Sequence, residues 1–118
     1  MSKWYILDNN HKPVISTAVK SSEWMEDNPN RKIVGYDELT DLNGDDVRVS
    51  TVFLGLDRAM PWDEDKTPVL WETMIFGGTH DQEYQERYTS YEDALEGHKV
   101  AVEIAIKSLK TEDNGNTE

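Results

Sequence analysis

The chain has 118 residues, and its 24 acidic and 12 basic side chains give a formal charge of −12. This charge repels nucleic-acid phosphates and anionic membrane surfaces, so we expect neither as a direct partner. The sequence has no cysteine, which excludes disulfides, thiolate metal ligands and cysteine nucleophiles. Hydrophobic residues make up 36% of the chain, enough for one folded domain with its own core.

The lengths of the apolar segments predict the location of the protein in the cell. No run of about 20 apolar residues is present to span a bilayer. The apolar segment near the start ends before Asp8, so it is too short for the apolar region of a signal peptide. Both features predict a cytoplasmic protein.

The first third of the chain combines short strands with one short helix. Residues 4–7 and 14–17 are typical of two strands around a turn rich in Asp and Asn. A serine at position 21 and a proline at position 29 predict the start and end of a helix of about two turns. Residues 31–39 then predict a further strand.

The middle of the chain supplies the centre of the predicted sheet. An Asn-Gly pair at 43–44 indicates a tight turn. Residues 47–54 and 69–76, on either side of the loop 57–68, are the clearest strands. Both have apolar residues at consecutive positions, so we expect these strands to be covered on both faces. Residues 84–88 predict a short edge strand.

The last element is a helix. Residues 89–92 match a capping box, and an apolar stripe at helical spacing then runs from Ala94 to Leu109 and includes His98. The predicted fold is a single α+β domain over residues 1–110: a small, mainly antiparallel sheet with the C-terminal amphipathic helix packed on one face. Residues 111–118 are predicted to be a disordered polar tail.

A glutamate at position 72 lies in an otherwise apolar strand, where a buried carboxylate needs a partner. Its candidate partners are Arg48, Arg58, Arg87 and His98. We interpret Glu72, Arg87 and His98 as a candidate buried polar cluster, with a structural ion pair as the favoured role. The alternative is a site in which Glu72 and His98 act as acid and base or bind a metal, with Asp57 as a third ligand.

The loop after residue 56 has an aromatic residue among acidic ones. The candidate interaction surface on this loop comprises Met60, Trp62, Asp63, Glu64 and Asp65. Trp62 either folds back as a lid on the sheet or is exposed as an anchor for a partner protein. The acidic clusters of the chain favour solubility, and the alternative is mimicry of nucleic-acid phosphates.

Three segments in order carry a family resemblance. Val49–Asp57 (VSTVFLGLD), Glu72–Phe76 (ETMIF) and Glu86–His98 (ERYTSYEDALEGH) resemble segments of a group of small proteins encoded by bacteriophages and prophages. The resemblance implies a phage-type accessory protein in the cytoplasm of an infected or lysogenic bacterium, and it implies origin more than activity. Those proteins often have a histidine directly after the Gly-Leu-Asp segment, where this chain has Arg58, so chemistry that depends on that histidine is not implied here.

No phosphate-binding loop, dinucleotide motif, serine-hydrolase elbow or His-Glu-x-x-His motif is present in the sequence. We therefore expect no enzyme activity, no catalytic residue, no cofactor and no metal. The leading hypothesis is a non-catalytic acidic module that binds a host or phage protein. The alternatives are a small metal- or ligand-binding domain or enzyme that uses Glu72 and His98, and a homo-oligomeric structural protein.

Overall fold

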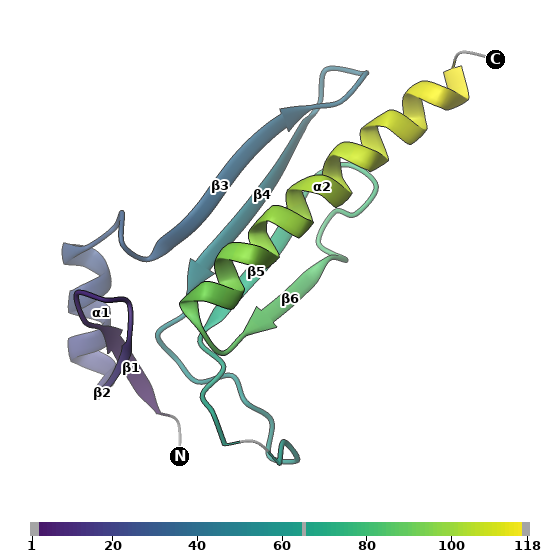
Figure 1. Cartoon of the computed structure of the whole chain (residues 1–118). Coiled ribbons are helices and arrows are strands. Elements are labelled where there is room, and N and C mark those ends of the chain that lie inside the picture. Colours follow the sequence, from purple (N-terminus) through teal and green to yellow (C-terminus); the bar gives the residue numbers. More distant parts are fainter. Residues whose placement is uncertain (1–2, 65, 117–118) are drawn as a thin grey trace.

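The computed structural model describes residues 3–64 and 66–116, and over these residues the chain forms two antiparallel sheets and two helices. Figure 1 shows the two sheets and α2, which lies across the larger sheet. This arrangement confirms the predicted α+β class with its C-terminal helix on the sheet. The elements are β1 (Trp4–Leu7), β2 (Pro13–Ser16), α1 (Ala18–Asp27), β3 (Ile33–Thr40), β4 (Asp46–Phe53), β5 (Trp71–Phe76), β6 (Gln85–Tyr88) and α2 (Tyr91–Asn116).

The N-terminal hairpin is closed by an Asp turn. The Asp8 carboxylate accepts hydrogen bonds from the backbone N–H of Lys12 at 2.9 Å and of Asn10 at 2.8 Å. These two bonds lower the pKa of Asp8, because they favour the ionised carboxyl. The hairpin contacts the start of α2 through His11, whose ring stacks on Tyr91 with centroids 3.9 Å apart.

The first helix begins earlier than the sequence predicts. Thr17 has an extended backbone, and its hydroxyl accepts a hydrogen bond from the backbone N–H of Lys20, so Thr17 caps α1 and the helix starts at Ala18. The predicted start at Ser21 is therefore wrong. Ser21 is buried inside the helix, and its hydroxyl donates to the Tyr5 carbonyl at 2.9 Å, which joins α1 to β1.

The larger sheet has the strand order β3-β4-β5-β6, and each neighbouring pair is antiparallel. The turn between β3 and β4 contains the predicted Asn-Gly pair, with Gly44 at a φ of 85°. In the register of β4 and β5, Arg48 lies opposite Phe76 at one end and Phe53 lies opposite Trp71 at the other. The long loop between β4 and β5 leaves the sheet at this second end.

Alternate residues of the central strands face α2. In β4 these are Val47, Val49, Thr51 and Phe53, and in β5 they are Trp71, Thr73 and Ile75; all are buried. The buried side chains form two apolar clusters, one around Trp71 and Phe53 and the other around Val49 and Ile75. Helix α2 contributes small alanines to both clusters, which allows its backbone to approach the sheet.

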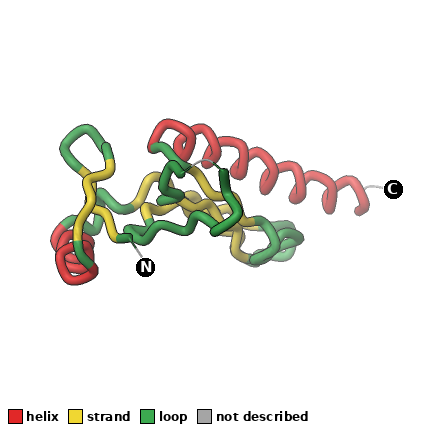
Figure 2. The backbone as a smooth tube through the Cα atoms, turned by 90° about the horizontal axis from the view of Figure 1, so that it is seen from below, coloured by secondary structure: helices red, strands yellow, loops and turns green. Residues whose placement is uncertain are grey.

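The other face of the sheet corrects the sequence prediction, which has both central strands covered on each side. Figure 2 shows α2 along one side of the larger sheet, and no described helix along the other. Burial alternates residue by residue in β4 and β5, as expected for a sheet covered on one side. We call the uncovered side the open face; its residues are Tyr36, Glu38, Arg48, Ser50, Val52, Glu72, Met74, Phe76, Gln85 and Arg87.

Helix α2 extends to Asn116, beyond residue 110, where the sequence predicts that a disordered tail begins. Residues 111–116 continue the helix, whereas residues 117–118 lie outside the described part of the chain. No proline interrupts this segment, so its backbone can continue the helical hydrogen bonding. Over the described residues, neither helix has the combined length and apolar character needed to cross a membrane.

Candidate functional site

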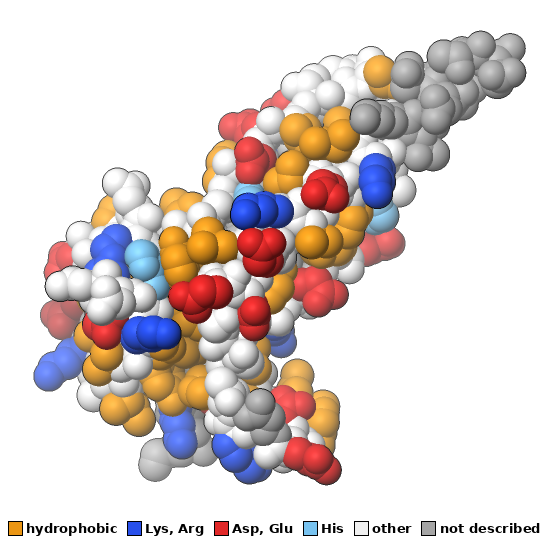
Figure 3. Space-filling view, viewed as in Figure 1, with side chains coloured by type: hydrophobic (Ala, Val, Ile, Leu, Met, Phe, Trp, Pro, Cys, Tyr) orange, Lys and Arg blue, Asp and Glu red, His pale blue; other side chains and the backbone are white. Residues whose placement is uncertain are grey.

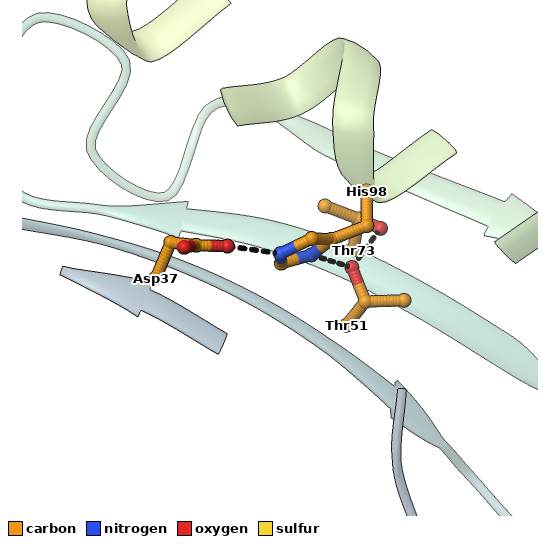
Figure 4. Close-up of polar contacts among 4 residues, drawn as sticks. All are labelled: Asp37, Thr51, Thr73 and His98. Carbon is orange, nitrogen blue, oxygen red and sulfur yellow. Dashed lines mark hydrogen bonds and ion pairs between the residues drawn. The ribbon is translucent and has the colours of Figure 1, made fainter. Parts of the chain in front are cut away.

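A chain of side-chain hydrogen bonds crosses the sheet beneath α2. His98 bonds Asp37 through Nε2 at 2.7 Å and Thr51 through Nδ1 at 2.7 Å. The Thr51 hydroxyl bonds that of Thr73 at 2.5 Å, and the Tyr88 hydroxyl donates to Thr73 at 3.0 Å. Figure 4 shows the first four of these residues. We call Asp37, His98, Thr51, Thr73 and Tyr88 the polar relay; it joins β3, β4, β5 and β6 to α2.

The donors and acceptors of the polar relay fit one direction. One consistent assignment has Tyr88 donating to Thr73, Thr73 donating to Thr51, and Thr51 donating to Nδ1 of His98. The imidazole then donates from Nε2 to the Asp37 carboxylate. This assignment gives each link one donor and one acceptor, and it places an imidazole proton on Nε2 of His98.

Two glycines make room for the polar relay. A Cβ on Gly35 would lie 2.6 Å from the ring of His98, and a Cβ on Gly97 would lie 2.1 Å from the Tyr88 hydroxyl oxygen. Sequence reasoning missed every member of the relay except His98. A glycine inside a strand and another inside a helix are the signals of close approach that point to it.

A carboxylate, an imidazole and a hydroxyl in this order form the arrangement that activates a hydroxyl nucleophile. Here, however, none of the Thr51 surface is exposed, and its hydroxyl is also bonded to Thr73. A substrate therefore has no access to this oxygen. The relay also lies between the two apolar clusters of the core, so its geometry suits a scaffold that fixes α2 on the sheet.

Burial also affects the tyrosine at the end of the relay. The pKa of Tyr88 is raised mainly because burial disfavours the phenolate, and the hydrogen bond with Thr73 opposes this effect in part. At the opposite end, Asp37 has 52% of its side chain exposed. The relay therefore runs from a half-buried phenol to a carboxylate in contact with solvent.

The predicted cluster of Glu72, Arg87 and His98 divides into two groups. Arg87 Nε lies 2.9 Å from Glu72 Oε2, and Gln85 donates to the same oxygen at 2.6 Å. This ion pair lies on the open face, whereas His98 lies on the face under α2. The grouping of His98 with Glu72 is wrong, because neighbouring strand residues point to opposite faces and Thr73, not Glu72, points toward the helix.

The same geometry separates the residues of the alternative metal or acid–base site. Glu72 is on the open face, His98 is under α2, and Asp57 is at the base of the loop between β4 and β5. In the part of the chain that the structure describes, no three His, Asp or Glu side chains are placed to hold a metal ion. Those three residues therefore do not form one site.

Asp57 closes the base of the loop between β4 and β5. Its Oδ1 accepts hydrogen bonds from the backbone N–H of Ala59 and of Val69, both at 2.9 Å. The backbone N–H of Arg58 donates to the Val69 carbonyl at 2.9 Å as well. We call residues 57–69 the binding loop; its two ends are held together by the two bonds that involve Val69.

The tip of the binding loop is a turn that presents a tryptophan. The Met60 N–H donates to the Asp63 carboxylate at 2.8 Å, and the Asp63 N–H donates to the Met60 carbonyl at 3.0 Å. Trp62, between them, is 76% exposed, which decides between the two alternatives left by the sequence in favour of exposure. Asp65, the last residue of the predicted interaction surface, lies outside the described residues. Hydrophobic and acidic side chains lie together at this end of the molecule in Figure 3.

The surface of the described residues includes two small hollows. The first, of about 260 Å³, lies beside the binding loop and is lined by Asp63, Glu64, Thr67, Val69 and Thr89; we call it the loop hollow. The second, of about 180 Å³, lies on the open face and is lined by Tyr36, Arg48, Ser50 and Phe76; we call it the face hollow. Both are smaller than the roughly 300–1,000 Å³ typical of small-molecule sites. Each has room for a side chain of a partner.

Comparisons with protein-family models, with curated proteins and with solved structures find no match for this chain. The similarity of three segments to phage and prophage proteins therefore stays a prediction. What the molecule does has to be argued from its own surfaces.

Proposed function

We propose that this chain is a non-catalytic, phage-type accessory protein that binds a host or phage protein through its binding loop, in the cytoplasm of a bacterial host. The observation that carries the proposal is the 76% exposure of Trp62 on a loop whose ends are held by Asp57. Tryptophan side chains are mostly buried in folded proteins and are enriched where interfaces derive their affinity.

The shape of the binding loop favours affinity. The turn from Met60 to Asp63 fixes the backbone around Trp62, and the bond from Val69 to Asp57 fixes the base of the loop, before a partner arrives. A loop that is ordered in advance loses less conformational entropy when it binds. Trp62 therefore needs little rearrangement to enter a pocket on a partner.

The chemistry of the loop hollow favours a basic side chain as its occupant. Val69 supplies an apolar lining, and Asp63 and Glu64 supply carboxylates. The stem of an arginine or lysine packs on apolar surface while its charged group meets a carboxylate. Trp62 precedes Asp63 in the chain, and its ring is the preferred aromatic partner of such a cation. The proposed partner therefore presents an arginine or lysine.

Charge distribution supports this reading over mimicry of nucleic acid. On the molecular face shown in Figure 3, acidic side chains alternate with basic and hydrophobic ones instead of forming one acidic strip. A mimic of phosphates would concentrate its carboxylates. The charge of −12 instead attracts a basic patch on a partner toward the protein over a longer range.

Capture of partners from bacterial lysate tests the proposal. We expect immobilised protein to retain a set of proteins that Trp62→Ala does not retain, and we expect salt to release that set, because screening weakens charge contacts. Val19→Ala is the matched control, since Val19 is 69% exposed on α1, away from the loop. Equal capture by the Trp62→Ala variant and the unchanged chain contradicts the proposal.

A further inference from the structure

Arg48 forms an unusual feature of the open face. In an acidic chain its side chain is exposed and forms no ion pair with a described residue. Its guanidinium lies over the ring of Phe76, 5.7 Å from the centroid. Tyr36 and Ser50, which are opposite each other in the register of β3 and β4, complete the face hollow. The hollow thus combines a cation, two aromatic rings and a hydroxyl.

The chemistry of the face hollow specifies its occupant. An aromatic ring can stack on Tyr36 or Phe76 and lie against the guanidinium of Arg48. A carboxylate next to that ring can pair with Arg48 in a charge-assisted, bidentate contact. A volume of about 180 Å³ suits one large side chain. The expected occupant is therefore an exposed aromatic side chain followed directly by an acid.

The binding loop of this same chain has that pattern. Trp62 is exposed, and Asp63 and Glu64 follow it directly. Conversely, the loop hollow favours a basic side chain, and Arg48 is one. We infer that the face hollow of one copy receives Trp62 from the binding loop of a second copy of this chain. The inference rests on the proposed function, because it takes the loop to be a binding surface and adds a second copy of the chain to its partners.

One copy cannot fill its own face hollow. Arg48 and Phe76 lie opposite each other near one end of β4 and β5, and the loop leaves the other end after Phe53. The five residue-to-residue steps from Arg48 to Phe53 span about 17 Å of strand, and Figure 1 shows the loop extending away from the sheet at that end. The contact is therefore head to tail between copies, and such a contact builds open chains or rings.

Sedimentation velocity tests the inference. It is measured at physiological ionic strength, because salt then screens charges beyond about 8 Å and limits the repulsion between two chains of charge −12. The mass of the unchanged protein should rise with concentration above the monomer mass of 13.6 kDa. Trp62→Ala and Arg48→Glu should each remain at the monomer mass, whereas Val19→Ala should associate like the unchanged chain. Arg48 is exposed, so its substitution leaves the fold intact.

Mixing the two variants gives the decisive result. Trp62→Ala keeps the face hollow and Arg48→Glu keeps the loop, so an equimolar mixture should form a dimer of about twice 13.6 kDa and nothing larger. Formation of that dimer also shows that both variants are folded. A contact between two identical surfaces would not be restored by mixing.

Three results would each overturn the inference. The unchanged chain could stay monomeric up to about 1 mM, which is the weak end of specific association. The Arg48→Glu variant could associate normally, or the mixture could stay monomeric although each variant has a normal melting curve. Failure here is distinct from failure of the proposed function. If the chain is monomeric and lysate proteins still depend on Trp62 for capture, the loop binds another protein. If capture is also independent of Trp62, both proposals fail.

Discussion

The two sides of the central strands differ in how their polar groups are used. On the side under α2, Thr51 and Thr73 bond to each other, and Thr51 also bonds to His98. On the open side, Ser50, which is next to Thr51 in β4, and Arg48 of the same strand line a hollow that faces solvent. Alternation along a strand thus gives the same segment a scaffold side and a contact side. The lesson is that the buried histidine holds the fold, and the exposed aromatic and charged residues are the ones available to other molecules.

Replacing His98 should give the largest loss of stability. His98→Leu removes the imidazole that bonds the buried Thr51 hydroxyl and the Asp37 carboxylate. We expect the free energy of unfolding to fall by about 3 kcal/mol, measured by chemical denaturation. Lys99→Leu, at the next and exposed position of α2, is the control and should change it by less than about 0.5 kcal/mol. Equal effects at the two positions would show that the buried hydrogen bonds of His98 contribute no more to stability than an exposed helix position does.

The threonine pair should show coupling. Thr51→Val keeps the side-chain shape but removes the hydroxyl that joins His98 to Thr73, so we expect a loss of about 1–2 kcal/mol. Adding Thr73→Val should cost less than it does alone, because the bond between the two hydroxyls is already lost. A double-mutant cycle measures this difference. Strict additivity would show that the two hydroxyls act independently.

The ion pair on the open face should contribute less than the relay. Glu72→Gln weakens the contact of Glu72 with Arg87 at 2.9 Å. Because the side chain of Arg87 is partly exposed, we expect a loss below about 1 kcal/mol. Denaturation in low and high salt provides the check, since added salt should reduce the difference between the variant and the unchanged chain. A loss of unfolding free energy as large as that of His98→Leu would show that the open side also stabilises the fold.

High pH should give the smallest effect. Burial raises the pKa of Tyr88 above its ordinary 10.0. The unfolded chain therefore releases this proton first. The contribution of Tyr88 to stability is complete below pH 10 and is lost as the pH rises through the higher pKa of the folded state. Tyr88→Phe should make the fall in stability above pH 10 shallower in a pH series of melting curves. An unchanged slope would contradict this assignment, because Tyr5 and Tyr84, whose pKa values are also raised, remain in both proteins.

The sequence could predict much of the fold because its signals are local. The Asn-Gly turn and the stripe of α2 depend on residues close together in the chain, and both appear in the structure. The start of α1 was missed because Thr17 and Ser21 are both good caps, and only the contact of Ser21 with Tyr5 decides between them. The prediction that both sheet faces are covered was wrong, because apolar residues such as Val52 also occur on the open face, where they are only partly buried.

The relay could not be predicted from the sequence because its members are far apart in the chain. Asp37 and His98 are separated by 61 residues, and Thr51 and His98 by 47. The register of four strands brings them together, and a pattern of single residues does not encode that register. Trp62 was the opposite case. Its acidic neighbours and its loop position are visible in the sequence, and only its exposure needed the structure.

The central claim is that Trp62 serves binding and the relay serves the fold. The most direct test compares the proteins captured from one bacterial lysate by Trp62→Ala and by Thr51→Val. Trp62→Ala should lose the captured proteins with its melting temperature unchanged, and Thr51→Val should retain them with its melting temperature lowered. Capture that survives in Trp62→Ala but disappears in folded Thr51→Val would contradict the claim, because binding would then depend on the buried side of the sheet.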